Sequence, residues 1–292
     1  MGGCGIAPPT RPRSVPRTPF PERDVVVLGL RLRYIDVGPT AVAEPDDTLL
    51  IIPGHTARIE GFDEMVPALA ERHRVLVADL PGSGYSDKPD RPYRLRFYED
   101  VLAAFLDALG IDRAVPVGGS LGGNLVLRLG HRWPERFPRL ALWAPGGAWK
   151  AKPGLATLVR RVCGRRLFWP VVRIQSRSWY SPDFPGKEAA LAETFTYYRE
   201  IMGAGFVKMY WGIAADQVGT SLFAIAPEVT QPTLLMWGDQ DDGGGMEAGV
   251  ARLHELLPDH RFVVFPGARH SIEAEIPAEV AATVLAWLAE TA

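Results

Sequence analysis

One serine stands at the centre of the sequence Val115-Pro116-Val117-Gly118-Gly119-Ser120-Leu121-Gly122-Gly123-Asn124. The apolar run before it has strand character, and the segment 125–129 after it continues as a helix would. A turn from strand to helix is so tight that the residues two before and two after the serine must lack bulk, and here both are glycine. The pattern therefore predicts a nucleophile elbow, a sharp turn that exposes the Ser120 hydroxyl.

Strands and helices alternate on both sides of this turn. A hairpin is expected over 25–37, and further strands at 48–52, 74–78, 114–117, 139–143, 233–237 and 261–265. Helices are expected over 97–109, ended by Gly110, and over 278–289 after Pro277. Such alternation predicts an α/β fold with a doubly wound, mostly parallel sheet, whose active site lies beyond the carboxyl ends of the strands.

The segment 148–227 interrupts this alternation. It has no strand pattern, is rich in Trp, Tyr and Phe, and is too long for a structureless loop in a compact protein. We therefore expect a helical cap at 148–227 on a core formed by 25–147 and 228–292, with its aromatic side chains divided between the cap's own core and a pocket. The first 24 residues contain six prolines and are expected to be a disordered leader.

Composition limits the possible partners. A net charge of -2 argues against nucleic-acid binding, and neither a signal-peptide core nor an apolar segment long enough for stable membrane insertion is present. The two cysteines lie far apart, which fits a reducing compartment and predicts a cytoplasmic protein. The basic run from Lys150 to Arg177 favours a solvated helix face over a surface that attracts an anionic substrate, an acyl carrier or a lipid surface, and both interpretations stay open. No oligomeric state follows from the sequence.

A serine hydroxyl becomes a good nucleophile only when an imidazole takes its proton and a carboxylate orients that imidazole. Candidates for both follow predicted strands: an acidic loop at 238–242 after strand 233–237, and His270 after strand 261–265. Spacing alone leaves Asp239, Asp241 and Asp242 open as the carboxylate.

Four motifs in this order resemble the α/β-hydrolase family over everything after the leader. Besides the elbow these are Asp79-Leu80-Pro81-Gly82-Ser83-Gly84-Tyr85-Ser86, the acid loop Gly238-x-x-Asp241 and the histidine loop Gly267-x-x-His270. The resemblance implies that Ser120 is the nucleophile, His270 the general base and then acid, and Asp241 the orienting carboxylate. It implies no metal or organic cofactor.

A developing oxyanion needs two preorganised donors. The resemblance implies the backbone N–H of Leu121, directly after the nucleophile, and that of His55 in the loop Pro53-Gly54-His55-Thr56. The family usually has His-Gly-x in this loop, so Pro53 is a departure, and we expect an altered loop rather than a lost oxyanion hole. The sequence leaves open whether the His55 imidazole faces the pocket or the solvent.

The leading hypothesis is a serine hydrolase that cleaves a small or medium apolar carboxylic ester, or thioester, through an acyl-enzyme on Ser120. One alternative is a carbon–carbon bond hydrolase, because Trp143-Ala144-Pro145-Gly146-Gly147-Ala148 resembles a segment of the meta-cleavage-product hydrolases. Others are a cofactor-independent lyase and a non-catalytic ligand-binding protein of the same fold. Haloalkane dehalogenases and epoxide hydrolases are disfavoured, since they need an aspartate where Ser120 stands.

Overall fold

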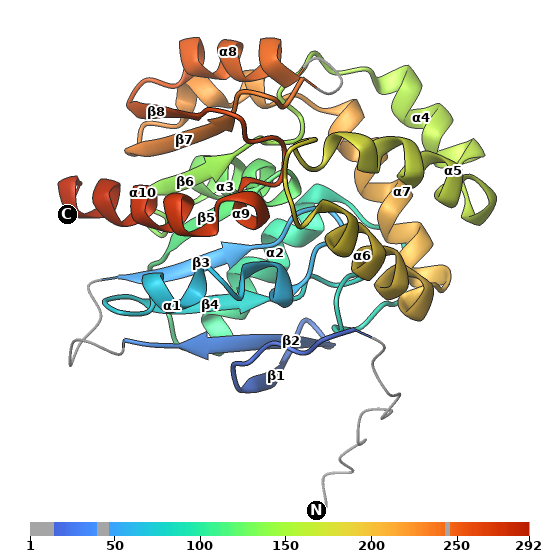
Figure 1. The fold of residues 1–292 in the computed structure, drawn as a ribbon, viewed down its shortest axis with the longest axis horizontal. Helices are drawn as coiled ribbons and strands as arrows, with labels where there is room; N and C mark the ends of the chain where they lie inside the picture. Colours follow the sequence, from blue (N-terminus) through green and yellow to red (C-terminus); the bar gives the residue numbers. More distant parts are fainter. Residues whose placement is uncertain (1–14, 40–46, 243–245, 292) are drawn as a thin grey trace, which may run out of the picture.

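The computed structural model describes residues 15–39, 47–242 and 246–291, which fold around one eight-stranded sheet (Figure 1). Its order is β1-β2-β4-β3-β5-β6-β7-β8. The β1–β2 and β2–β4 pairs are antiparallel and every other pair is parallel, which confirms the predicted doubly wound sheet. The strands are β1 (Glu22–Val27), β2 (Leu30–Val37), β3 (Thr48–Ile52), β4 (Arg74–Ala78), β5 (Val115–Gly119), β6 (Leu140–Trp143), β7 (Thr233–Gly238) and β8 (His260–Phe265).

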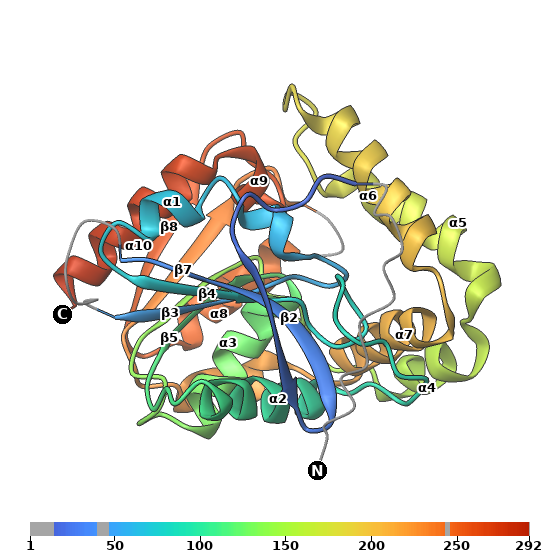
Figure 2. The ribbon, with the colours of Figure 1, turned by 90° about the horizontal axis from the view of Figure 1, so that it is seen from below.

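Helices cover both faces of the sheet. Figure 2 shows α1 (Val66–Leu69) and α10 (Pro277–Glu290) on one face and α2 (Leu95–Ala108) and α3 (Leu121–Arg132) on the other. Helix α2 lies within two residues of its predicted position and ends before Gly110, whose φ of 68° favours glycine. The remaining α-helices of the core are α8 (Met246–Leu256) and α9 (Ile272–Glu275). Short 3₁₀ helices occur at Ile59–Phe62 in the core and, between β6 and β7, at Ser176–Ser178, Leu222–Ala224 and Ala226–Glu228. Among the helices of the described residues, none combines the length and the apolarity that crossing a membrane requires.

Four α-helices lie between β6 and β7, in the segment where no strand pattern was found: α4 (Pro153–Val162), α5 (Arg165–Gln175), α6 (Lys187–Ile201) and α7 (Ala204–Gly219). We call them the inserted helices; they lie together at one end of the sheet (Figure 1). Aromatic rings join α5, α6 and α7. The ring of Phe168 is fully buried and meets the rings of Tyr198, Phe206 and Tyr210 edge-on, at centroid distances of 4.9 to 5.6 Å.

The predicted leader needs a correction at its second half. Residues 1–14 lie outside the described residues, but Val15 and Thr18 are buried and β1 begins at Glu22. The Thr18 hydroxyl donates to Asp63 Oδ1 at 2.6 Å, which ties this segment to the loop before α1. The prediction of disorder up to residue 24 is therefore wrong for 15–24, because a proline-rich segment can pack along a fold without forming an element of its own.

Strand β3 passes so close to the elbow that only glycine fits at two of its positions. A Cβ atom added to Gly118 would stand 2.7 Å from the carbonyl oxygen of Ile52, and one added to Gly122 would overlap the same oxygen. Backbone atoms on a central strand cannot move aside, so neither position has room for a side chain. Between them Ser120 has φ 55° and ψ -116°, a strained conformation that the surrounding backbone enforces.

This crowding predicts a stability effect. We expect Gly122→Ala to lower the free energy of unfolding by about 2–4 kcal/mol, because the methyl group must push apart β3 and α3. Urea unfolding followed by circular dichroism measures it. Gly154→Ala in α4 is the matched control: an added Cβ meets nothing within 4 Å there, so stability should hold or rise by up to about 1 kcal/mol. Equal unfolding midpoints for Gly122→Ala and the wild type would contradict the expectation.

Candidate active site

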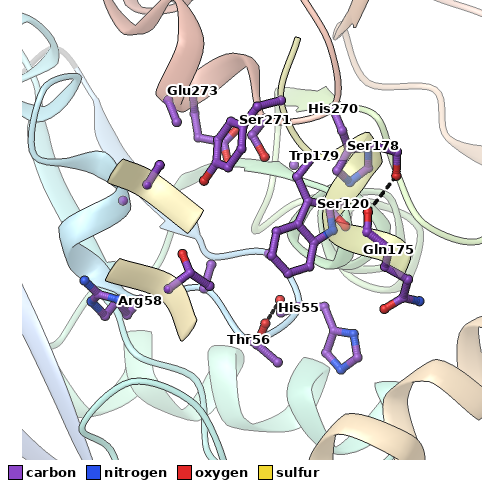
Figure 3. A pocket seen from close by; sticks show the side chains of 18 of the residues that line it. His55, Thr56, Arg58, Ser120, Gln175, Ser178, Trp179, His270, Ser271 and Glu273 are labelled. Atoms are coloured by element: carbon purple, nitrogen blue, oxygen red, sulfur yellow. Dashed lines mark hydrogen bonds between the residues drawn. The ribbon is translucent and has the colours of Figure 1, made fainter. Parts of the chain in front are cut away.

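A cavity of about 720 Å³ opens at the carboxyl ends of the central strands (Figure 3). Ser120, Asp241 and His270 all line it, although they are far apart in the sequence. Each follows a strand of the parallel part of the sheet, β5, β7 and β8 respectively, so the topology brings them to one edge.

Ser120 joins β5 to α3. Its backbone N–H donates to the carbonyl of Trp143 at 3.1 Å, and its own carbonyl accepts from the N–H of Gly146 at 2.9 Å, which fixes the strained turn on the neighbouring strand. Leu121 is the first residue of α3, so its backbone N–H has no acceptor within the helix. The positive end of the helix dipole and this N–H therefore lie directly beside Ser120.

His270 and Asp241 form a hydrogen-bonded pair, with 2.7 Å between Nδ1 and Oδ2. The structure thereby distinguishes the three carboxylates that spacing left open. Asp241 is buried, whereas Asp242 is exposed and pairs with Arg269 at 2.7 Å. Asp239 points elsewhere and accepts from the backbone N–H of Gly267 at 2.8 Å.

The pair shifts the titration of the imidazole. Burial lowers the pKa of His270, but the hydrogen bond and the charge of Asp241, together with the charges of Glu273 and Glu275, raise it by more. The net pKa lies above the ordinary value of 6.5. An imidazole with this pKa binds a proton more readily than a free histidine, which suits a general base.

Trp143 and Glu273 are among the cavity residues for which the sequence predicted no role. Trp143 ends β6 opposite Gly119, and its Nε1–H donates to Glu273 Oε2 at 2.9 Å. A Cβ on Gly119 would overlap this indole, so the glycine directly before Ser120 leaves room for Trp143. Burial raises the pKa of Glu273, while this hydrogen bond and the charge of His270 lower it by less. The sequence did contain one indication of this contact, because a bulky residue, Trp143, ends the strand next to β5.

The loop after β3 borders the nucleophile, as its motif predicted. A Cβ on Gly54 would lie 3.5 Å from Ser120 Cβ, so the Gly54–His55 backbone passes directly beside the serine. Thr56 has φ 68°, and its hydroxyl lies 2.5 Å from the hydroxyl of Tyr198 on α6. This contact ties the loop to the inserted helices.

The His55 ring is not a solvent-facing side chain. It stacks on Tyr210 of α7 at a centroid distance of 4.8 Å with 21° between the planes. Burial lowers the pKa of His55 to about 4, and the Tyr210 backbone carbonyl opposes that shift only in part. The ring is therefore neutral near pH 7 and adds no positive charge to the cavity.

Negative side chains outnumber positive ones around the cavity. Its only arginine among the described residues, Arg58, is already paired with Glu60, at 3.2 Å, and with Glu193. The inserted helices and the segments that join them contribute seven lining side chains with aromatic rings: Trp149, Trp179, Tyr180, Phe184, Tyr197, Tyr198 and Tyr210. The acidic lining residues are Glu60, Glu64, Glu193, Asp241 and Glu273. Within the described ranges, no three or more His, Cys, Asp or Glu side chains are grouped to hold a metal ion.

Comparisons with known proteins agree with this geometry. The family model described as alpha/beta hydrolase fold matches residues 47–273. The chain is 26% identical to a 2-hydroxymuconate semialdehyde hydrolase of Pseudomonas sp., over 91% of this chain and 82% of that protein. It is 25% identical to haloalkane dehalogenase 2 of Mycobacterium tuberculosis, over 87% of this chain and 90% of the other. The crystal structure of the enol-lactonase from Burkholderia xenovorans superimposes with a TM-score of 0.75 at 23% identity, covering 91% of this chain and all of that one (100%). The chain therefore belongs to the α/β-hydrolase family, as its four motifs predicted, and is a hydrolase of that type.

Proposed function

We propose that this protein is a serine hydrolase of the carboxylesterase type, which cleaves small or medium apolar carboxylic esters, or thioesters, through an acyl-enzyme. One observation carries the proposal: the His270–Asp241 pair, 2.7 Å between Nδ1 and Oδ2, lines the same cavity as the serine of a strained elbow. Those three groups are the ones that acyl transfer on serine needs.

In this mechanism Ser120 Oγ attacks the carbonyl carbon while His270 Nε2 takes the hydroxyl proton. Asp241 holds Nδ1–H and stabilises the imidazolium, which then returns the proton to the leaving alcohol or thiol. Water, activated by the same imidazole, attacks the acyl-enzyme and frees the acid and Ser120. The backbone N–H groups of Leu121 and His55 are the proposed oxyanion donors, each contributing about 3 kcal/mol to lowering the barrier.

The cavity favours a neutral, largely apolar substrate. Segment 148–227 contributes seven of the aromatic rings that line it, over the strand ends, which supports a role for this segment as a cap. The acidic lining residues repel an anionic group, and Arg58 is engaged with two of them. A cavity of about 720 Å³ accommodates a small or medium acyl chain rather than a polymer.

Glu273 supplies a direct test of this charge argument. In an assay at alkaline pH, chosen because burial raises the pKa of Glu273, we expect Glu273→Gln to raise kcat/KM for an ester with a carboxylate on its acyl chain by about fivefold. Removing one negative charge from the cavity lining lowers the repulsion of the substrate carboxylate by about 1 kcal/mol, because the site is partly open to water. A neutral ester of equal length should change by less than about twofold. Equal changes for both esters would contradict electrostatic selection.

Carbon–carbon bond hydrolysis is the second candidate. It is favoured by the similarity to the 2-hydroxymuconate semialdehyde hydrolase and by Gly146, which lies in the Ala144-Pro145-Gly146-Gly147 segment and lines the cavity. A muconate derivative carries a carboxylate, however, and the described lining offers only the paired Arg58 to receive it. The ester is therefore the better substrate for this cavity.

Dehalogenation is disfavoured despite the similarity to haloalkane dehalogenase 2. A carboxylate that attacks an alkyl carbon gives an ester, which water can open. A serine at the same position would give an ether that the cavity has no means to hydrolyse, and the residue here is Ser120.

Chromogenic aryl esters of graded acyl length, together with a fluorophosphonate probe and mass mapping of the labelled peptide, test the proposal. We expect rapid turnover and label on Ser120, with the optimum chain length reporting the depth of the cavity. Label without ester turnover would favour the carbon–carbon hydrolase, a lyase or a ligand-binding protein. The absence of label would overturn a nucleophilic role for Ser120.

A further inference from the structure

Helices α4 and α5 expose apolar stripes that no part of the described chain covers. On α4 the stripe consists of Leu155, Leu158 and Val162, at spacings of three and four residues that place them on one helix face. Leu158 and Val162 are 56% and 61% exposed. On α5 the exposed residues are Leu167 and Ile174, two turns apart, with Ile174 66% exposed. Isolated exposed leucines are ordinary, but several exposed aliphatic residues on two consecutive helices are not.

The opposite faces of both helices hold them to the protein. Ala156 of α4 is buried against α7, where a Cβ on Gly219 would lie 2.9 Å from it. Phe168 and Val172 of α5 are buried among the aromatic rings. Because these residues point inward, the exposed stripes point away from the core. Figures 1 and 2 both show α4 and α5 at the outer edge of the inserted helices.

Positive charge surrounds the stripes. No acidic residue occurs between Lys150 and Pro182, although the whole chain has a net charge of -2. Arg160 pairs with Asp216, whereas Arg165 and Arg166 form no ion pair with another described residue. The basic residues, all exposed, are Lys150, Lys152, Arg160, Arg161, Arg165, Arg166, Arg173 and Arg177. We call these residues and the two stripes the basic apolar surface.

We infer that the basic apolar surface docks the protein on a membrane that contains anionic phospholipids. An amphipathic helix with Leu, Val or Ile on one face and Lys or Arg beside them lies in the plane of such a membrane. Its apolar side chains enter the boundary of the acyl region and its cations meet the phosphates. A soluble acidic partner would need the cations alone and would leave the aliphatic stripes in water, so the combination favours lipid.

Docking would also place the active-site cavity close to the lipid. Helix α5 ends at Gln175, and Gln175, Ser178 and Trp179 line the cavity. An apolar ester dissolved in the membrane would then have a short path to Ser120. This consequence rests on the proposed function, whereas membrane binding itself does not.

The test is co-sedimentation of the full-length protein with large unilamellar vesicles. We expect binding to phosphatidylcholine vesicles with about 30 mol% phosphatidylglycerol at low salt, and a partition coefficient at least about tenfold lower for pure phosphatidylcholine. Two variants separate the contributions. Leu158→Ser with Ile174→Ser removes apolar insertion, and Arg161→Gln with Arg165→Gln and Arg166→Gln removes charge. Each should lower the partition coefficient by about tenfold or more.

Variants on two other surfaces of the protein, the β1–β2 hairpin and α8, are the matched controls. Val26→Ser with Leu28→Ser exchanges apolar residues that are 69% and 60% exposed on the β1–β2 hairpin, and Arg252→Gln removes an exposed cation of α8. Both should bind vesicles as the wild type does. Turnover of a water-soluble ester should be equal in all variants, which separates this test from that of the proposed function.

Three outcomes would overturn the inference. Absence of wild-type binding to anionic vesicles at low salt would exclude docking. Loss of binding in the arginine variant alone would show that charge suffices, which fits an acidic protein partner instead. A stable dimer in analytical ultracentrifugation that Leu158→Ser with Ile174→Ser dissociates would show that a second copy of the chain covers the stripes.

Discussion

Replacing Ser120 by alanine is expected to lower kcat for an aryl ester by about 10⁴-fold or more. The substitution removes only the hydroxyl group, and the mechanism has no other nucleophile at the end of β5. The remaining groups would still bind the ester and polarise its carbonyl, so a residual rate above that in water should persist. Single-turnover kinetics would show no burst of released phenol, because no acyl-enzyme can form.

The control for this variant is a measurement that its fold and stability are retained. Ser120 has φ 55°, which costs alanine about as much as serine, so circular dichroism and urea unfolding should match the wild type within about 1 kcal/mol. Ser120→Gly, which tolerates this φ more easily, should be as inactive and slightly more stable. An unchanged kcat in either folded variant would exclude an acyl-enzyme on Ser120.

The strands of the fold were predictable because each is a short apolar run followed by a polar or glycine-containing turn. All of them were placed within three residues of their observed starts, including β3 and β7 in the interior of the sheet. No bounds were predicted for helix α8, since its few apolar positions do not form a clear stripe in sequence. The inserted helices were predicted only as a group, because their aromatic residues pack among themselves and do not follow one helical period.

The candidate site was predictable only as far as motifs mark single positions. Ser120 and His270 each follow a strand and stand in a glycine-containing motif, whereas three aspartates compete in the acid loop. Only the three-dimensional arrangement shows that Asp241 contacts His270 while Asp239 contacts the turn at Gly267.

Trp143 and Glu273 were missed for a related reason. Their contact joins β6 to α9, segments 130 residues apart, and no local pattern encodes it. The orientation of the His55 ring was equally undetermined, since the stacking partner Tyr210 belongs to α7.

Replacing Asp241 by asparagine is expected to lower kcat/KM for the aryl ester by about 10³–10⁴-fold. The amide has nearly the same shape, but it carries no charge to stabilise the imidazolium, and its NH₂ group can hold the wrong tautomer of His270. The hydrogen bond of 2.7 Å between Nδ1 and Oδ2 is the contact that this variant alters.

The same variant should move the pH profile of the residual activity, and the direction follows from the pKa of His270. Burial lowers this pKa, and the hydrogen bond and charge of Asp241, with smaller contributions from Glu273 and Glu275, raise it to a net value above 6.5. The general base must be neutral, so wild-type kcat/KM should fall as the pH drops through that raised pKa. In the Asp241→Asn variant this carboxylate no longer opposes the effect of burial on the pKa of His270. The midpoint of the acidic limb of the pH profile should therefore shift to lower pH.

A neighbouring carboxylate gives the matched control for both effects. Asp242 is exposed and pairs with Arg269 rather than with the imidazole. Asp242→Asn should therefore keep kcat/KM within about twofold of the wild type and leave the midpoint unchanged, because a surface pair contributes little to a site it does not touch. If Asp242→Asn shifted the acidic limb as far as Asp241→Asn does, the raised pKa of His270 would reflect the general negative charge of the loop, and Asp241 would lose its assigned role of orienting the base.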